Sequence, residues 1–259
     1  RRRTNDTGIY TRERNGSGGE GCAMSAICIS DLHLDATVPK RLDALNNLLV
    51  LESEKVEAIY VLGDLVEAWV GDDDDSQFAD DLRTILAGCM QHTALYLMHG
   101  NRDFLIGKKF ANDTGACLID DPVTVEVEGR RVLLSHGDAF CTKDEPYQQM
   151  RKLFRSADWQ RDILSRTLQE RIHLANEMRE QSRQTNANKS QNIMDVTDEV
   201  VLSVMQENAC DVLVHGHTHR PGIHRLDNVK TRYVLGDWNR CGWLARIEDS
   251  GISLECFSI

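Results

Sequence analysis

Five short polar motifs, each placed where a strand-like apolar run ends, restrict the fold of this chain more than any other feature. The runs consist mostly of Val, Ile, Leu and Tyr, the residues typical of buried strands. The motifs are Asp31-x-His33, Gly63-Asp64, Gly100-Asn101-Arg102-Asp103, His136-Gly137-Asp138 and Gly216-His217-Thr218-His219. Because strand ends in a layered α/β domain converge on one rim, these side chains are expected to share one site.

The donor atoms in these motifs suit a metal site. They are imidazole nitrogens and carboxylate and amide oxygens, with no Cys among them, which favours Mn, Fe, Zn or Mg over a thiolate site. Each motif alone has an ordinary structural interpretation, since Asp-x-His can be a cap with a hydrogen-bonded histidine and Gly-Asp is a turn signal. Their joint occurrence, in this order and at strand ends, predicts a centre of two metal ions.

The first part of the chain alternates strand and helix, and the last part is richer in hairpins. Strands are expected over 25–30, 58–62 and 94–98, and helices over 39–54, 76–90 and 104–113. A hairpin is expected from 123–127 and 131–134, joined by residues 128–130. A helix over 196–208 is followed by strands over 211–214, 223–226, 231–235, 243–247 and 252–257. This order is typical of an α/β domain with two packed sheets and helices outside.

Residues 143–195 interrupt that pattern with a helical stretch that contains no strand-like run. Leu164, Leu168, Ile172 and Ala175 form an expected apolar stripe, and four arginines are expected off it. These arginines are Arg161, Arg166, Arg171 and Arg179. An insertion between the fourth and fifth motifs is expected to lie over the site as a helical lid. The alternative is an ordinary solvated helical hairpin packed elsewhere.

Charge and composition exclude some classes of function. The chain has 259 residues and a formal net charge of −11, which argues against a protein that coats nucleic acid. An anionic substrate stays compatible, because bound divalent ions would dominate the local field. No apolar stretch approaches the ~18–20 residues of a membrane span. The eight cysteines form no C-x-x-C pair, which predicts reduced thiols in a cytosolic protein.

Residues 1–23 differ from the rest in being rich in Arg, Gly and Ser and poor in large apolar residues. They contain no apolar core of a signal peptide. We expect a disordered N-terminal extension here, with Met24 as a natural start and residues 24–259 as the folded domain.

Taken in order, the five motifs resemble those of the calcineurin-like metallophosphoesterases, and the resemblance covers roughly residues 25–257. It implies a four-layer α/β/β/α sandwich that holds two divalent ions. It also implies that Asp31, His33 and His219 hold one ion, that Asn101, His136 and His217 hold the other, and that Asp64 bridges them. Two such ions can activate water and stabilise the oxygens of a phosphoryl group during displacement.

Arg102 occupies the position at which many members of this family have a histidine. A guanidinium with a pKa above about 12 cannot act as a general acid at neutral pH, but it can bind phosphate through two hydrogen bonds. An enzyme without that acid works best on a leaving group that departs unaided. A phosphate monoester, with a second pKa of about 6, meets this condition, whereas an alkoxide does not. The sequence therefore predicts cleavage of a diphosphate linkage.

Longer strings narrow the resemblance to the family of UDP-2,3-diacylglucosamine pyrophosphatases of lipid A synthesis. They include Gly63 to Trp69, Gly100 to Phe104, His217 to Pro221 and Asn192 to Val196. The resemblance implies hydrolysis to UMP and diacylglucosamine 1-phosphate, usually with manganese, by an enzyme peripherally bound to the cytoplasmic face of the inner membrane. It implies catalytic roles for Asp64, Arg102 and His217. The implied substrate contacts are Asn101, Arg102, Asp144, Ser182, Asn186, Lys189 and His217.

Two other classes of function stay open. A nuclease or cyclic-nucleotide phosphodiesterase would not need an acyl-accepting lid, and a nuclease is expected to have a basic groove. A non-catalytic scaffold on the same fold would be expected to have lost ligands, whereas all seven ligand positions carry competent residues. We expect no nucleic acid and no obligate protein as partner.

Several other polar residues receive only structural interpretations from the sequence. Residues 72–75 are expected to form a solvated acidic loop. His99 and His215 are expected to contact ligands from outside or to belong to the core, and Asp103 and Asp237 are expected to orient ligands or loops.

Overall fold

The computed structural model describes residues 3–4, 10–11, 25–90, 92–187, 193 and 195–259, with the backbone alone for 3–4, 10–11 and 186–187. Within the first 23 residues it places two-residue strands, β1 (Arg3–Thr4) and β2 (Tyr10–Thr11). The expected disordered extension otherwise lies outside the described residues and stays a prediction.

A six-stranded sheet in the order β13-β12-β3-β4-β5-β6 carries the first three motifs. Strands β3 to β6 run parallel, and β12 is antiparallel to both β3 and β13. Its strands are β3 (Ala26–Ile29), β4 (Ala58–Leu62), β5 (Ala94–Met98), β6 (Cys117–Ile119), β12 (Gly242–Glu248) and β13 (Gly251–Phe257).

A seven-stranded sheet in the order β1-β2-β7-β8-β9-β11-β10 carries the other two motifs. Its longer strands are β7 (Val123–Val127), β8 (Arg130–Ser135), β9 (Val212–His215), β10 (Gly222–Arg225) and β11 (Thr231–Val234). The β7–β8 hairpin closes through Glu128 and Gly129, both with positive φ, as a two-residue hairpin turn requires. β8, β9 and β11 run parallel, so the ends of β8 and β9 lie together.

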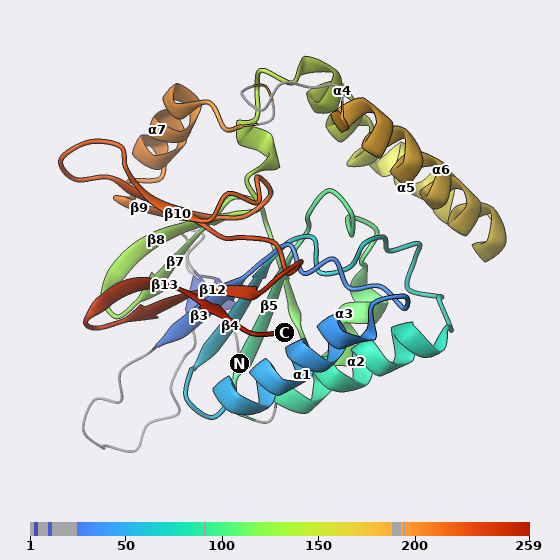
Figure 1. Cartoon of the computed structure of the whole chain (residues 1–259), viewed down its shortest axis with the longest axis horizontal. Helices are drawn as coiled ribbons and strands as arrows, with labels where there is room; N and C mark the ends of the chain where they lie inside the picture. The colour runs from blue at the N-terminus through green and yellow to red at the C-terminus, as the bar shows by residue number, and fades with distance from the viewer. Residues whose placement is uncertain (1–2, 5–9, 12–24, 91, 188–192, 194) are drawn as a thin grey trace.

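The two sheets pack face to face, and helices cover their outer faces (Figure 1). Alternate residues of β3 divide between two cores: Ala26 and Cys28 pack between the sheets, and Ile27 and Ile29 pack under helices. The helices on the six-stranded sheet are α1 (Pro39–Glu52), α2 (Gln77–Cys89) and α3 (Lys108–Thr114). On the other sheet, α7 (Asp198–Glu207) packs its Val201 against strand residues of a third core. The predicted four-layer α/β/β/α arrangement is therefore confirmed.

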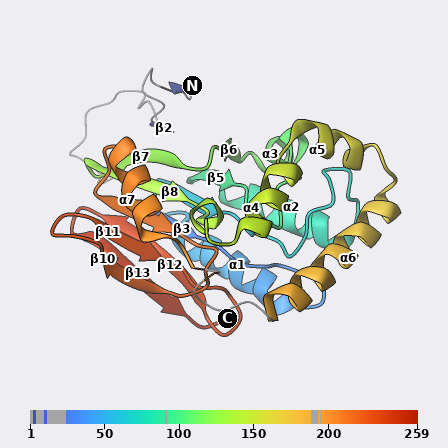
Figure 2. The ribbon, with the colours of Figure 1, turned by 90° about the horizontal axis from the view of Figure 1, so that it is seen from above.

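Three further helices lie beyond the strand ends: α4 (Glu145–Phe154), α5 (Ala157–Leu164) and α6 (Leu168–Ala187). They form an arc at one side of the sheets when the molecule is seen from above (Figure 2). The two ends of this segment meet, because the Thr142 and Thr197 hydroxyl oxygens lie 2.8 Å apart and Thr197 N donates to Phe140 O at 2.9 Å. Among the described residues, we find no helix with the length and apolarity needed to cross a bilayer.

Most expected elements form within a few residues of their predicted bounds, but the helix expected over 104–113 begins only at Lys108. The Asp72 carboxylate accepts hydrogen bonds from Gly107 N at 3.0 Å and Phe110 N at 2.9 Å, and so satisfies two of the N–H groups at the start of the helix. The short strand β6 was not expected, because three residues give too brief a pattern.

The structure also differs in part from the expected solvation of the acidic loop and from the expected course of the apolar stripe. Asp72 starts α3, and the Asp73 carboxylate binds the Arg171 guanidinium, so neither side chain is simply solvated. Arg171, expected off the stripe, is buried, whereas Leu164, expected on it, is exposed at the end of α5. The break between α5 and α6 separates Leu164 from the other three residues of the expected stripe.

Candidate metal centre

Five of the seven predicted ligands have a backbone conformation that residues other than glycine rarely adopt. Their φ angles are positive: Asp31 55°, His33 46°, Asp64 53°, His217 67° and His219 54°. Such conformations cost free energy in residues other than glycine and cluster at functional sites. Hydrogen bonds between the strand-end loops hold them in place, including Asp31 N to Gly63 O at 3.1 Å and His217 N to Asp31 Oδ2 at 2.9 Å.

The motif glycines allow these loops to approach closely. A Cβ atom at Gly63 would lie 2.6 Å from the Gly100 Cα atom, and one at Gly100 would lie 2.1 Å from Asp64 Oδ1. The buried Asp103 carboxylate then ties the two loops together, since it accepts from Leu65 N at 2.7 Å and from Gly100 N at 2.6 Å. Asp103 therefore orients loops, as the sequence predicted.

One half of the centre gathers around Asp31. His219 Nε2 lies 3.2 Å from Asp31 Oδ1 and 3.2 Å from His33 Nε2. His33 Nε2 also lies 3.8 Å from Asp64 Oδ2. Three ligand atoms of Asp31, His33 and His219 fall within 4.8 Å of one another, as in a metal site.

The other half gathers around Asn101. Its side-chain oxygen lies 3.0 Å from His136 Nε2 and 2.9 Å from His217 Nδ1. His136 Nε2 also lies 3.8 Å from Asp64 Oδ1. Asp64 therefore turns one carboxylate oxygen to each half, which is the position of a bridging ligand.

These residues fit two divalent ions. Imidazole nitrogens of His33 and His219 face each other beside a buried carboxylate, an arrangement that a shared cation would satisfy. The donors are nitrogen and oxygen atoms alone, which matches Mn, Zn, Fe or Mg. The structure brings all seven predicted ligands together, and their roles as ligands stay a prediction.

The electrostatics of the centre favour positive charge. Burial raises the pKa of Asp31, but the hydrogen bond and charge of His219 outweigh it and hold the pKa well below its usual range. Burial lowers the pKa of His219, yet Asp237 and Asp31 raise it to about 10. For His136, Asp64 and other carboxylates likewise outweigh burial and raise the pKa to about 9. A divalent ion would take the place of these protons, since imidazole binds metal only when deprotonated.

Two further histidines stay neutral. Burial, together with the charge of His136, lowers the pKa of His217 to about 4, so the ring is neutral and has one unprotonated nitrogen that could bind a cation. Burial and the nearby Arg232 lower the pKa of His215 to about 3. His215 is thus a core histidine, one of the two structural interpretations from the sequence. His99, the other residue with that interpretation, contacts Ile106 O through Nε2 at 2.7 Å.

A cavity of about 540 Å³ connects the centre with the three helices beyond the strand ends. His33, Asp64 and Asn101 line its inner end, whereas α4, α5 and α6 contribute an apolar wall. That wall includes Phe154, Trp159, Ile163, Leu174 and Met178. The Phe154 and Trp159 rings lie 4.8 Å apart between centroids, so part of the wall is a packed aromatic surface.

The predicted substrate contacts are distributed around this cavity. Arg102 lines it, and Arg102 Nε is buried with no hydrogen-bond partner in the described part of the chain. Asp144 lines it too, but its carboxylate accepts from Tyr147 N at 3.3 Å at the start of α4. Ser182 also faces the cavity. The Asn186 side chain and Lys189 lie outside the described residues, so their roles stay predictions.

Comparison with known proteins agrees with this geometry. The sequence model of the calcineurin-like phosphoesterase family matches residues 24–221 of this chain. The chain belongs to the calcineurin-like phosphoesterase family. A protein of Pseudomonas savastanoi named UDP-2,3-diacylglucosamine hydrolase is 42% identical over 235 residues, which are 89% of this chain and 95% of that protein. Proteins of the same name from Cellvibrio japonicus and Pseudomonas aeruginosa are 40% and 43% identical, over 91% and 88% of this chain and 100% and 97% of theirs. The resemblance drawn from the motifs is confirmed.

Sequence reasoning missed a buried ionic cluster that supports the centre of this phosphoesterase. The Asp138 carboxylate is fully buried and accepts from Tyr147 Oη at 2.8 Å and Arg151 Nε at 2.8 Å. Arg155 reaches the same carboxylate at 3.5 Å and donates to Gly100 O at 3.1 Å. Asp138 follows His136 by two residues, and Gly100 precedes Asn101, so the cluster joins α4 to both loops of the Asn101 half. The His-Gly-Asp motif was the only sequence signal for it.

Proposed function

We propose that this phosphoesterase hydrolyses the diphosphate bond of UDP-2,3-diacylglucosamine to UMP and 2,3-diacylglucosamine 1-phosphate, in lipid A synthesis. The observation that carries the proposal is the single cavity in which a candidate two-metal centre meets an apolar helical wall. A substrate with a diphosphate and two acyl chains needs both surfaces. The names of the relatives, at 40–43% identity, support the same substrate.

Seven residues would hold the metal ions, and their donor atoms suit manganese. Asp31, His33 and His219 would bind one ion, Asn101, His136 and His217 the other, and Asp64 both. When bound, two divalent ions polarise phosphoryl oxygens and lower the pKa of water. Asp64 is itself held by the Arg102 N–H, which donates to Oδ1 at 2.8 Å, so the backbone fixes this carboxylate between the two halves.

Arg102 would bind the diphosphate and stabilise the charge that develops on the departing sugar phosphate. Arg102 lines the same cavity as Asp64 and Asn101, and its Nε has no hydrogen-bond partner among the residues that the structure describes. A permanent cation with planar donors matches phosphate oxygens and supplies no proton. In the proposed reaction water attacks the phosphorus nearer the uridine, as in the resembling family, and the sugar 1-phosphate leaves without a general acid because a phosphate leaving group needs none.

The apolar wall would receive the acyl chains, with α4, α5 and α6 acting as a lid. Leu174, Met178 and Phe154 give the wall hydrocarbon and aromatic surface, beside arginines of the same helices that also line the cavity. On these helices Met150, Leu153 and Leu164 are also exposed, with 49%, 52% and 45% of their surface accessible. We propose that this exposed face brings the enzyme to the cytoplasmic face of the inner membrane, where the lipid substrate lies.

Product identification tests the proposal. The purified protein is incubated with UDP-2,3-diacylglucosamine and Mn²⁺ in water labelled with heavy oxygen, and the Asp64→Ala variant serves as the control. The expected products are labelled UMP and unlabelled diacylglucosamine 1-phosphate, and the variant is expected to release neither. Label in the lipid phosphate would overturn the assigned point of attack. Equal turnover of simple alkyl phosphomonoesters would overturn the diphosphate specificity.

A further inference from the structure

Each histidine on the Asp31 side of the centre is backed by a carboxylate. His33 Nδ1 lies 3.1 Å from Glu67 Oε2, and His219 Nδ1 lies 3.4 Å from Asp237 Oδ2. In both rings the opposite nitrogen, Nε2, faces the other ligands. Each carboxylate therefore holds its imidazole in the tautomer that leaves Nε2 free for a metal ion.

The histidines on the Asn101 side have different partners. His136 Nδ1 lies 2.9 Å from Leu62 O, a neutral backbone carbonyl, and its Nε2 faces Asn101. Asn101 is itself an uncharged ligand. Asp138, a buried carboxylate that also acts on the histidines of this half, is already bound by Arg151 and lies near Arg155, so its charge is compensated within the protein.

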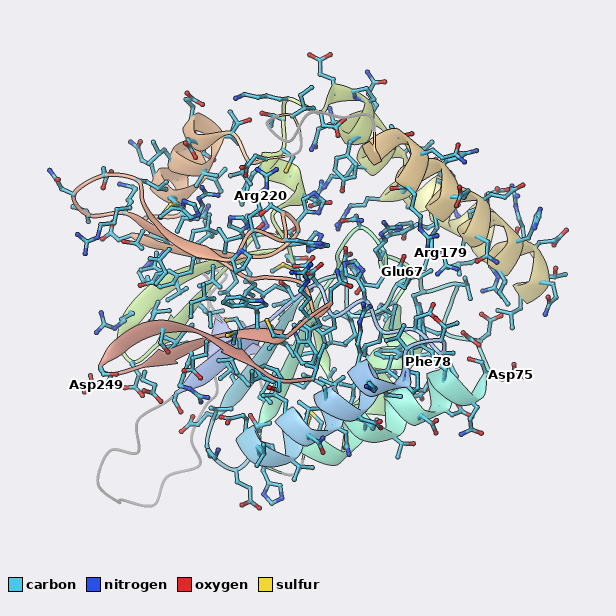
Figure 3. All side chains as sticks on the ribbon, in the orientation of Figure 1. Glu67, Asp75, Phe78, Arg179, Arg220 and Asp249 are labelled. Carbon is cyan, nitrogen blue, oxygen red and sulfur yellow. The ribbon has the colours of Figure 1, made fainter. Side chains whose placement is uncertain are left out.

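Both backing carboxylates are fixed to the ligand loops. Glu67 N donates to Leu34 O at 2.9 Å, which places Glu67 on the strand-end segment that follows Asp64. Glu67 lies beside Arg179 of α6 in the space between that helix and the sheets (Figure 3). In the loop after β11, Trp238 N donates to Asp31 O at 3.2 Å, and so holds its neighbour Asp237 near His219.

From this asymmetry we propose that Glu67 and Asp237 are positioning residues that make the Asp31 position the tighter of the two metal sites. A carboxylate behind an imidazole raises the basicity of the ring and adds negative charge, and its loss weakens metal binding about 10- to 100-fold. Two such carboxylates contact histidines of the Asp31 position, whereas in the described part of the chain the corresponding nitrogen of His136 contacts a backbone carbonyl. The ions therefore bind in order, the Asp31 position first, and the Asn101 position exchanges its ion more readily. This inference rests on the two-metal centre of the proposed function but not on its substrate.

Metal titration of the chelator-treated full chain tests the order of binding. Mn²⁺ is added while bound and free ion are measured by calorimetry and by the magnetic resonance signal of free Mn²⁺. The wild-type protein is expected to bind two ions with dissociation constants at least about 10-fold apart. Asn101→Ala is expected to remove the weaker step and to leave the tighter one.

The two positioning residues are then replaced by their amides. Glu67→Gln and Asp237→Asn are each expected to weaken the tighter step about 10- to 100-fold and to change the weaker step by less than about 3-fold. Asp35→Asn is the matched control, because Asp35 lies two residues from His33 but contacts Thr37 and Arg179 instead of a ligand. It removes a nearby charge without removing an imidazole contact and is expected to change either step by less than about 3-fold.

Specific results would overturn the inference. Two equal sites in the wild-type protein would do so, as would Glu67→Gln and Asp237→Asn variants that weaken both steps alike or no more than Asp35→Asn. Each of those results leaves the proposed function intact, whereas a wild-type protein that binds no ion contradicts both. Circular dichroism of each variant establishes folding, and if one amide variant does not fold, the other decides the outcome.

Discussion

Arg171 of α6 is buried against the loop that follows β4, where its guanidinium binds both carboxylate oxygens of Asp73. Arg171 Nη1 donates to Asp73 Oδ1 at 2.7 Å and to Val70 O at 2.5 Å. The Arg171 side chain is 3% exposed and that of Asp73 is 63% exposed. This contact attaches α6 to the domain that carries the candidate metal centre.

Loss of this attachment is expected to loosen the lid. Arg171→Met should lower the free energy of unfolding by about 1–3 kcal/mol, since it leaves Val70 O without its buried donor. Asp73→Asn should cost less, because Asp73 is largely exposed and the bond to Val70 remains. Urea denaturation measures both effects, and Asp74→Asn on the same loop is the control. Equal losses of unfolding free energy for Asp73→Asn and Arg171→Met would contradict the greater weight given to the bond between Arg171 and Val70 O.

Replacement of Arg102 should act on catalysis rather than on folding. Arg102→Met is expected to reduce kcat about 10²- to 10³-fold, because it removes the cation that we propose binds the diphosphate. Arg102→Lys keeps the charge but not the planar pair of donors, so its kcat should lie between those of Arg102→Met and the wild type. Steady-state release of UMP measures both. A wild-type kcat in Arg102→Met would refute this role.

Metal binding should release protons. In the metal-free protein the pKa values of His219 and His136 are raised to about 10 and about 9, above the ordinary 6.5, so both rings are protonated at pH 8. A metal ion must displace those protons, and its apparent affinity should therefore rise with pH until about pH 10. Calorimetry at pH 8, in two buffers of different ionisation enthalpy, should give a release of about two protons. His219→Gln should release about one fewer, and a wild type that releases none would contradict the prediction.

The apolar wall should be sensitive to charge. Met178→Glu on α6 is expected to raise KM for the diacylated substrate at least about 10-fold, since a buried carboxylate beside an acyl chain is costly to desolvate. Hydrolysis of a small activated phosphodiester, which does not reach the wall, should be unchanged. His173→Glu is the matched control on the same helix, because that side chain is 76% exposed. Equal effects of the two variants on KM would refute the acyl site.

Deletion of the whole lid is a weaker test than this point variant. Tyr147 and Arg151 of α4 are partners of the fully buried Asp138. A deletion would leave that carboxylate buried without them, a change that costs about 3–5 kcal/mol. Loss of activity would then report on folding as much as on the binding of acyl chains.

The local features of this protein could be predicted from its sequence. Strand–helix alternation indicated β4 and β5 with their observed bounds, because apolar runs closed by glycine motifs leave few other structures. The sequence also predicted that the seven candidate ligands lie at one rim, because the ends of parallel strands lie at the same edge of a sheet. Gly63 and Gly100 allow the two loops to approach, and this requirement is visible as glycine in the motifs themselves.

Tertiary structure alone decided the residues that act across long separations. Asp72 sets the start of α3, Asp73 binds Arg171 across 98 positions, and Glu67 and Asp237 contact two of the predicted ligand histidines. The sequence gives no sign of such contacts, because an acidic loop has the same composition whether its side chains are solvated or bound to a helix. The sequence by itself determined which atoms can bind metal and on which strand ends they lie. The packing of loops and helices decided which charges surround each ligand, because that depends on distances that only the folded chain brings about.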